Sequence, residues 1–487
     1  MTFVTITFLL FLTLAFLFYY LVPKHDQWIV LLVFSVIFYL FAGWEKLIFV
    51  FIAACIAFFV GRNCTKVNLT LGIVLIVCSL FYVKAGTAVL EALRFKGSII
   101  VPLGISYYSF SIIGYMLDVY YKKIEPEGNL LRFLLYMIYF PHILEGPIPR
   151  YGKLASQLFE GHVFDYKGFC FGVQRALWGY FKKLVIADRI SIYTSEVFTN
   201  YTSYSGIYFF TAVVLSSIQL YADFSGCMDI ALGVSECFGI TLDENFKRPF
   251  FAKNAAEFWR RWHITLGFWF KDYVYTHLAI HSGLLKLSKR AKDRVSKRFG
   301  KSLITIIPLA VVWILTGLWH GTGADYILWG MYWGLIIILS TVFSKEWKAL
   351  NTKLGMDVKS KGFQRFQMIR TFFVFSGARL LTAPGDLKVS FYMLKKMFSL
   401  WKWKEFFRGG ALVDGIFIWD VILVFAGILL LYIVGKEQEK GISIREKISE
   451  YSIPLRWVFY YGLFFATLVF GIYGPGFKAG DFVYIQF

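Results

Sequence analysis

The chain has 487 residues, of which 58% are hydrophobic and 20% are aromatic, and its mean hydropathy is +0.60. Soluble domains contain roughly 45–50% apolar residues, so this composition excludes an ordinary soluble protein and indicates an integral membrane protein. The formal net charge of +20 would suit a nucleic-acid partner, but 15 Trp, 30 Tyr and 53 Phe favour lipid instead, and we expect no nucleic-acid binding.

Long apolar runs predict most of the fold. About 20 apolar residues cross a bilayer core as a helix. The clearest uncharged runs cover 2–22, 28–44, 47–61, 67–83, 97–117, 303–319, 326–343, 421–434 and 457–475, and weaker apolar stretches lie around 131–144, 168–187 and 206–222. We therefore expect an all-α, polytopic transmembrane helical bundle with roughly 10–12 spans, because lipid offers no partner to unpaired backbone groups.

Basic residues predict the orientation of these spans. Lys and Arg gather in the block 286–301 and again in the loop 435–456, and the positive-inside rule places both on the cytoplasmic side. The N-terminus and the tail 474–487 are then expected outside. No repeat or soluble domain is evident, so residues 1–487 are treated as one membrane domain.

The middle third of the chain differs from its two ends. Between Pro102 and His320 the sequence is dense in Gly, Pro, Trp and charged residues within apolar surroundings. Irregular polar backbone at membrane depth is tolerated only where protein or a water-filled cavity surrounds it. We expect peripheral helices at about 1–96, a core with re-entrant segments at about 97–345 that holds the functional site, and C-terminal helices at about 366–487.

The stretch NAAEFWRRWH predicts a helix start, with Asn254 as N-cap and Glu257 completing a capping box. His263 then falls near the end of the third turn, next to Trp262 and close to Arg260. An interfacial helix with snorkelling arginines explains this segment when it is taken alone.

Other polar groups are explained most simply by packing. His277 and His281 have the i, i+4 spacing of a zinc pair but lack the Glu of H-E-x-x-H and a third ligand, so we expect no metal site. Ser225 lacks the G-x-S-x-G context of a nucleophile. Asp223 and Asp229 do not share a helix face and are expected to pair with Lys or Arg inside the bundle.

His320 lies at the end of an uncharged run and is followed by Gly-Thr-Gly. A lone histidine on an apolar helix is usually a packed core residue. Here the glycines predict that the helix ends at His320 and that backbone can approach a ligand closely. An imidazole with an ordinary pKa of about 6.5 is a usable base near neutral pH.

These segments together resemble the membrane-bound O-acyltransferase family, and in particular its branch of bacterial polysaccharide O-acetyltransferases. The resemblance covers most of the chain and is carried by PLGISYYSF, FPHILEGPIPRY, YADFSGCMDIALG, ENFKRPF, EFWRRWHITLGFWFKDYVY and GLWHG. His142 and Glu145 are departures from the family pattern, and they leave the identity of the acceptor open.

The resemblance implies that His320 is the family's histidine deep in a central tunnel, and that His263 is its second motif residue on the cytoplasmic side. His320 would then act as the base, worth roughly 10²- to 10⁴-fold in rate, while His263, Trp319 or backbone N–H groups would stabilise the oxyanion. Residues expected to line the tunnel are Trp319, Trp262, Asp223, Ser225, Asn245 and Arg260.

The implied reaction moves an acyl group, most simply acetyl, from a cytoplasmic acyl-CoA or acyl-carrier thioester to an envelope polysaccharide. No bound cofactor is expected. The implied setting is a multi-pass protein of a bacterial cell membrane, with lipid around it and an extracytoplasmic acyltransferase as partner. D-alanyl transfer to teichoic acid, a transporter, and a non-catalytic scaffold remain as alternatives, although the paired half-helices and internal repeats of a transporter are not found in the sequence.

Overall fold

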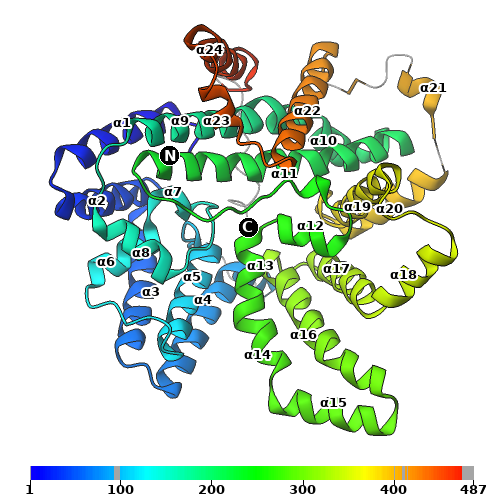
Figure 1. Ribbon diagram of the computed structural model, residues 1–487, viewed down its shortest axis with the longest axis horizontal. Coiled ribbons are helices and arrows are strands. Elements are labelled where there is room, and N and C mark those ends of the chain that lie inside the picture. Colours follow the sequence, from blue (N-terminus) through cyan, green and yellow to red (C-terminus); the bar gives the residue numbers. More distant parts are fainter. Residues whose placement is uncertain (1, 93–98, 400, 408–411, 414, 474–487) are drawn as a thin grey trace. The chain divides into compact units, whose positions relative to one another are not determined.

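The computed structural model describes residues 2–92, 99–399, 401–407, 412–413 and 415–473 (Figure 1). Within these ranges all named elements are helices, and β pairing is limited to one isolated antiparallel bridge between Phe246 and Trp262. The all-α prediction is therefore confirmed. The expected outer tail 474–487 lies outside the described residues.

Contacts divide the chain into two compact units, each built from segments that are distant in sequence. Unit 1 comprises Met1–Asp188, Ala222–Glu244 and Leu431–Phe487, and unit 2 comprises Arg189–Tyr221 and Asn245–Leu430. The helices α11 (Gly206–Cys237) and α22 (Ile418–Glu439) run from one unit into the other. The sequence-based division into peripheral helices, core and C-terminal helices stays a prediction.

The remaining helices of unit 1 include one π-helical segment, η2. They are α1 (Ile6–Leu21), η1 (Lys24–Asp26), α2 (Gln27–Leu40), α3 (Trp44–Arg62), α4 (Lys66–Ala92), α5 (Ile105–Tyr120), α6 (Leu130–Ile138), α7 (Phe140–Ile143), α8 (Tyr151–Glu160), α9 (Tyr166–Tyr180), η2 (Phe181–Ala187), α23 (Ile444–Ser449) and α24 (Ile453–Phe470).

Unit 2 contains a second π-helical segment, η5. Its other helices, beginning with α10 at the junction of the units, are α10 (Asp188–Thr199), η3 (Tyr201–Ser203), η4 (Pro249–Phe251), α12 (Ala255–Arg261), α13 (Ile264–Phe270), η5 (Lys271–Tyr275), α14 (Thr276–Ala279), α15 (Ser282–Arg294), α16 (Lys297–His320), α17 (Ala324–Val342), α18 (Ser344–Lys353), α19 (Lys361–Thr382), α20 (Leu387–Ser399) and α21 (Trp403–Glu405).

Seven described helices are long and apolar enough to cross a membrane: α3, α4, α11, α16, α17, α22 and α24. This number is below the expected 10–12 because several apolar runs form shorter helices. The run 28–44 gives α2, which ends at Leu40 before Gly43 takes a φ of +130°. The run 97–117 gives α5, which begins only after Gly104 takes a φ of +70°. The chain is nonetheless a polytopic helical protein.

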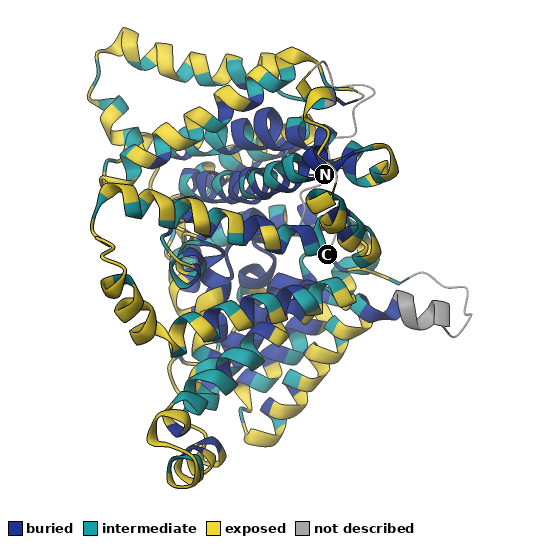
Figure 2. Cartoon of the chain, turned by 90° about the vertical axis from the view of Figure 1, so that its right-hand side faces the viewer, coloured by how far each residue is buried: buried dark blue, intermediate teal, exposed yellow. Residues whose placement is uncertain are grey.

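The long helices carry many exposed residues, which are yellow in Figure 2, and many of these residues are large and apolar. In α24, for example, only Thr467 is buried, while Trp457, Val458 and Phe465 are exposed. Lipid tails are as apolar as these side chains, so such faces are suited to a bilayer and would be unfavourable in water.

Close backbone packing joins α9 to the part of α11 that lies in unit 1. A Cβ added to Gly172 would meet the carbonyl oxygen of Gly233 at 2.5 Å, and one added to Gly179 would meet that of Gly226 at 2.5 Å. Only glycine permits this approach, and small residues serve the same purpose at many membrane helix interfaces. The contact continues into η2, directly after α9.

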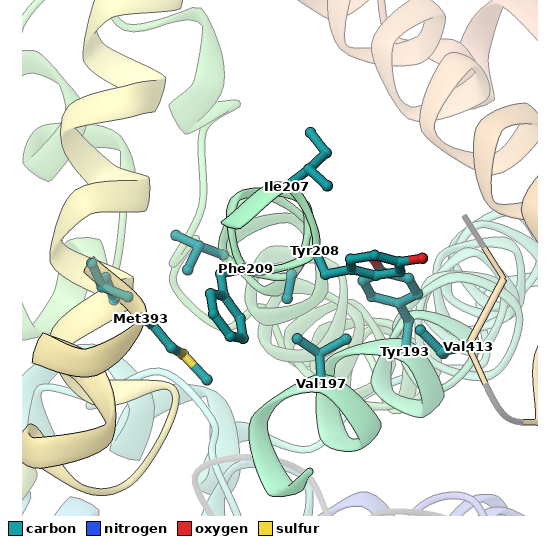
Figure 3. Close-up of a cluster of buried hydrophobic side chains, with 10 residues drawn as sticks. Tyr193, Val197, Ile207, Tyr208, Phe209, Met393 and Val413 are labelled. Carbon is teal, nitrogen blue, oxygen red and sulfur yellow. The ribbon is translucent and has the colours of Figure 1, made fainter. Parts of the chain in front are cut away.

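An apolar cluster in unit 2 holds the start of α11 against other helices (Figure 3). Ile207 and Phe209 of α11 pack there with Val197 of α10 and Met393 of α20, and all four side chains are buried. This packing fixes α10, α11 and α20 as one body within unit 2.

Candidate active site

His320 lies at the C-terminus of α16, as the sequence predicts. The helix ends because Gly321 is extended, with its backbone N–H donating to the carbonyl oxygen of Gly317 at 3.1 Å, and α17 then starts at Ala324. The imidazole is 7% exposed. The reversal of the chain after His320 brings α17 back along α16 (Figure 1).

Aromatic rings surround the imidazole of His320. The rings of Trp319 and Trp329 stand edge-on to it, with centroids at 4.7 Å and 4.9 Å, and the ring of Tyr326 is stacked at 6.3 Å. Two of these rings come from α17. They reach the histidine because a Cβ at Gly317 would lie 2.6 Å from the carbonyl oxygen of Tyr326, an approach that needs glycine.

His263 lies between α12 and α13 rather than within a helix, which corrects the sequence-based prediction. The predicted start is right, since Asn254 Oδ1 accepts the N–H of Glu257 at 2.9 Å. Glu257 accepts the N–H of Lys253 at 2.9 Å, whereas a capping box would have it accept the N–H of the N-cap residue Asn254. However, α12 ends at Arg261 after seven residues, and His263 then adopts φ +46° and ψ +53°. Arg260 is exposed on α12.

Asn245 is the main polar neighbour of His263. Its Oδ1 lies 3.4 Å from His263 Nδ1 and accepts hydrogen bonds from the backbone N–H and the hydroxyl of Thr265, at 3.0 Å and 2.8 Å. Asn245 and His263 are 1% and 2% exposed. Burial lowers the pKa of His263 from 6.5 to about 3, so the ring is neutral at physiological pH.

Trp319 connects the two histidines. Its ring centroid lies 5.9 Å from that of His263 and 4.7 Å from that of His320. Trp262, the residue before His263, is buried against Phe246, with ring centroids 5.0 Å apart. Six of the eight residues singled out from the sequence lie in unit 2. Arg260 is exposed, and the other five are buried: His320, Trp319, His263, Trp262 and Asn245.

Asp223 and Ser225 belong to unit 1, where each binds a lysine of η2. Asp223 pairs with Lys183 at 2.7 Å, and Ser225 Oγ accepts a hydrogen bond from Lys182 at 2.8 Å. Lys182 also pairs with Asp229 at 2.7 Å. The prediction that Asp223 and Asp229 pair with basic residues inside the protein is confirmed.

The two lysines of η2 were missed by the sequence reasoning. Lys182 and Lys183 are 3% and 2% exposed and fall within the weak apolar run 168–187. An ionisable pair in such a run is itself a signal of a buried polar site. Their partners lie about forty residues further along the chain, and no sequence motif specifies them.

His281 and His142 have local structural roles. His281 caps α15 by accepting the N–H of Gly283 at 3.2 Å, and α14 ends at Ala279, so His277 and His281 do not share a helix. His142 is buried with its Nε2 3.1 Å from the carbonyl oxygen of Tyr136, and Glu145 is completely buried. Neither feature defines the acceptor.

The fold and site define a multi-pass helical membrane protein that gathers two buried histidines around one tryptophan. The sequence model of the membrane-bound O-acyltransferase (MBOAT) family matches residues 121–292 of this chain. The probable alginate O-acetylase AlgI of Pseudomonas putida is 30% identical over 364 residues, which are 74% of this chain and 69% of that protein. The chain therefore belongs to the membrane-bound O-acyltransferase family.

Two further relatives place the chain within this family. The probable alginate O-acetylase AlgI of Pseudomonas syringae pv. tomato is 30% identical over 71% of this chain, but the match spans only 62% of that relative's length. The teichoic acid D-alanyltransferase of Bacillus subtilis is 29% identical over 50% of this chain and 60% of its own length. The chain thus lies in the alginate O-acetylase branch of bacterial multi-pass membrane O-acyltransferases.

Proposed function

We propose that this protein transfers an acetyl group from a cytoplasmic thioester to a hydroxyl group of an envelope polysaccharide. The observation that carries the proposal is the contact of Trp319 with both His263 and His320. Acyl transfer needs a group that can accept and return a proton, and an imidazole can do this. The buried aromatic rings around the two imidazoles provide an environment of low dielectric constant.

In the proposed reaction His320 accepts the proton of the acceptor hydroxyl as its oxygen attacks the thioester carbonyl. The carbon–oxygen bond forms, and the tetrahedral oxyanion is stabilised by the indole N–H of Trp319 or by backbone N–H groups beside it. The carbon–sulfur bond then breaks, and His320 gives the proton that it accepted to the departing thiolate, which leaves as a thiol. Atoms and charges balance without any bound cofactor.

The donor is proposed to be acetyl-CoA or an acetylated carrier protein on the cytoplasmic side. The acceptor is proposed to approach from the other face, and the two meet in a tunnel at His320. A His320→Cys variant, made without the six native cysteines, tests the tunnel. A small polar thiol reagent should label this cysteine if water reaches it, whereas a lipid-buried thiol stays protonated and inert.

The proposed function is tested by labelling membranes that contain the chain with radioactive acetyl-CoA or acetylated carrier protein. The wild-type chain should transfer label to polysaccharide when its extracytoplasmic partner is present, and His320→Ala should not, although both accumulate equally. Equal labelling by the two would leave His320 as a packed residue and favour the scaffold alternative.

D-alanyl transfer is the second candidate, because the matched relatives include a teichoic acid D-alanyltransferase. The same two histidines would serve, since the reaction again moves an acyl group from a thioester to a hydroxyl. Parallel assays with D-alanyl-carrier and acetyl donors separate the two proposals, and transfer from the D-alanyl donor alone would overturn the first.

A further inference from the structure

The left-handed backbone of His263 is imposed by a short antiparallel pairing. The carbonyl oxygen of Asn245 accepts the N–H of Ile264 at 3.1 Å, and the N–H of Lys247 donates to the carbonyl oxygen of Arg261 at 2.9 Å. The segment 245–247 thereby pairs with both sides of His263. A residue other than glycine at positive φ persists only where its surroundings determine it, and such residues cluster at active sites.

The hydrogen bonds of Asn245 also determine which nitrogen of His263 carries the proton. A backbone N–H can only donate, so the amide atom facing the N–H of Thr265 at 3.0 Å must be the oxygen. The same oxygen lies 3.4 Å from His263 Nδ1. An amide oxygen can only accept, so Nδ1 is the protonated nitrogen. In a neutral ring Nε2 then holds the lone pair.

We propose that Asn245 is a positioning residue, which holds His263 with Nδ1 protonated and Nε2 presented to the substrates as a hydrogen-bond acceptor. This inference rests on the proposed function and assigns a specific role to His263. Nε2 orients an O–H or N–H of a bound substrate other than the reacting hydroxyl, whose single proton is accepted by His320. It cannot donate to the oxyanion, and that donation falls to Trp319 or to backbone N–H groups.

Removing the Asn245 side chain should therefore slow catalysis more than it weakens binding. Without its acceptor, the imidazole is free to rotate and to exchange its proton between the two nitrogens. We expect Asn245→Ala to lower kcat at least tenfold with little change in KM for acetyl-CoA. If the alanine variant does not accumulate, Asn245→Ser serves instead, because its oxygen is one bond shorter and is withdrawn from Nδ1.

A conservative variant should restore activity. Asn245→Asp keeps an oxygen facing the three donors, and we expect kcat at pH 8 within about threefold of the wild type. A carboxylate nearby raises an imidazole pKa by roughly 1–3 units. Because burial holds the pKa of His263 at about 3, the ring still stays neutral at pH 8. Asn254→Asp is the matched control, since this exposed N-cap keeps its capping oxygen and gains the same charge.

A double-mutant cycle tests whether Asn245 acts through His263. In a His263→Gln background, Asn245→Ala should lower the residual transfer less than threefold, because the group that it positions is already gone. Tenfold losses in both backgrounds, or an aspartate variant as inactive as alanine, would overturn the proposal. If the wild-type chain transfers no acyl group at all, the proposed function fails, and that outcome is distinct from failure of this inference.

Discussion

Trp319 and His263 lie with their ring centroids 5.9 Å apart and their planes at 62°, although 55 residues separate them in sequence. Since His320 follows Trp319 directly, this one contact brings the two histidine motifs to the same place. The family model match, which ends at residue 292, covers only the first of them. The aromatic contact therefore connects a region recognised by that model to one that it does not cover.

Trp319→Phe is expected to keep the ring contact with both histidines and to remove the indole N–H. If this group donates to the oxyanion, kcat should fall about 10²-fold with KM unchanged, as for loss of a single oxyanion donor. Trp313→Phe is the control, because Trp313 lies on the same helix and contacts other tryptophans. Equal activity of the two variants would assign the donation to backbone N–H groups.

His320→Gln is expected to be as inactive as His320→Ala, with kcat lowered at least 10²-fold. Glutamine retains much of the shape of histidine but cannot take up the proton of the acceptor. Initial rates of acetyl transfer by membranes with matched protein content measure the effect. Substantial activity of the glutamine variant would show that His320 is a packed residue and not the base.

Asp188 should make the stability of the protein depend on pH. Its carboxylate lies 2.9 Å from Lys183, but burial and the nearby Asp223 raise its pKa to about 7. An unfolded Asp has a pKa of about 3.9. The contribution of protonated Asp188 to the free energy of unfolding is therefore complete below that pH and is lost as the pH rises through about 7. The melting temperature should fall from pH 5 to pH 8. Asp188→Asn should flatten this dependence, and the exposed Asp293→Asn should not.

The basic residues of α15 should assist binding of an anionic donor. Leu284 and Ser288 are buried, while Lys286, Lys289 and Arg290 are exposed. Reversing these three charges should raise KM for acetyl-CoA several-fold and make it less sensitive to salt. Reversal of Lys345, Lys348 and Lys353, which are exposed on α18, is the control. An unchanged KM with altered topology would instead support anchoring on anionic lipid.

The purified chain alone is not expected to acetylate soluble polysaccharide. The described residues form helices and the connections between them, and the expectation rests on the proposed function, in which the polymer acceptor lies outside the cell. Transfer should appear when an extracytoplasmic acyltransferase from the same cell envelope is added. Efficient acetylation of polymer by the chain in detergent without this partner would contradict the expectation.

Much of the local structure could be predicted because its causes lie within a few residues. The N-cap at Asn254 and the end of α16 at His320 follow from side chains and glycines beside them. Apolar runs predicted the helices, but not their lengths. The motif YADFSGCMD belongs to the middle region for which re-entrant segments were expected, yet it lies within the 32-residue helix α11. Its Gly226, like Gly233 further along the helix, allows close packing against α9.

Composition, apolar runs and motifs were enough to predict a helical membrane protein with candidate catalytic histidines at 263 and 320, since these signals are properties of neighbouring residues. The backbone conformation of His263 could not be predicted, because it depends on pairing with the segment that begins at Asn245, 18 residues upstream. Tertiary structure also decided the partners of Lys182 and Lys183. The physical reason is the same in both cases: a strained backbone or a buried charge is stable only when distant groups supply its hydrogen bonds and ion pairs, and the chain must fold before those groups meet.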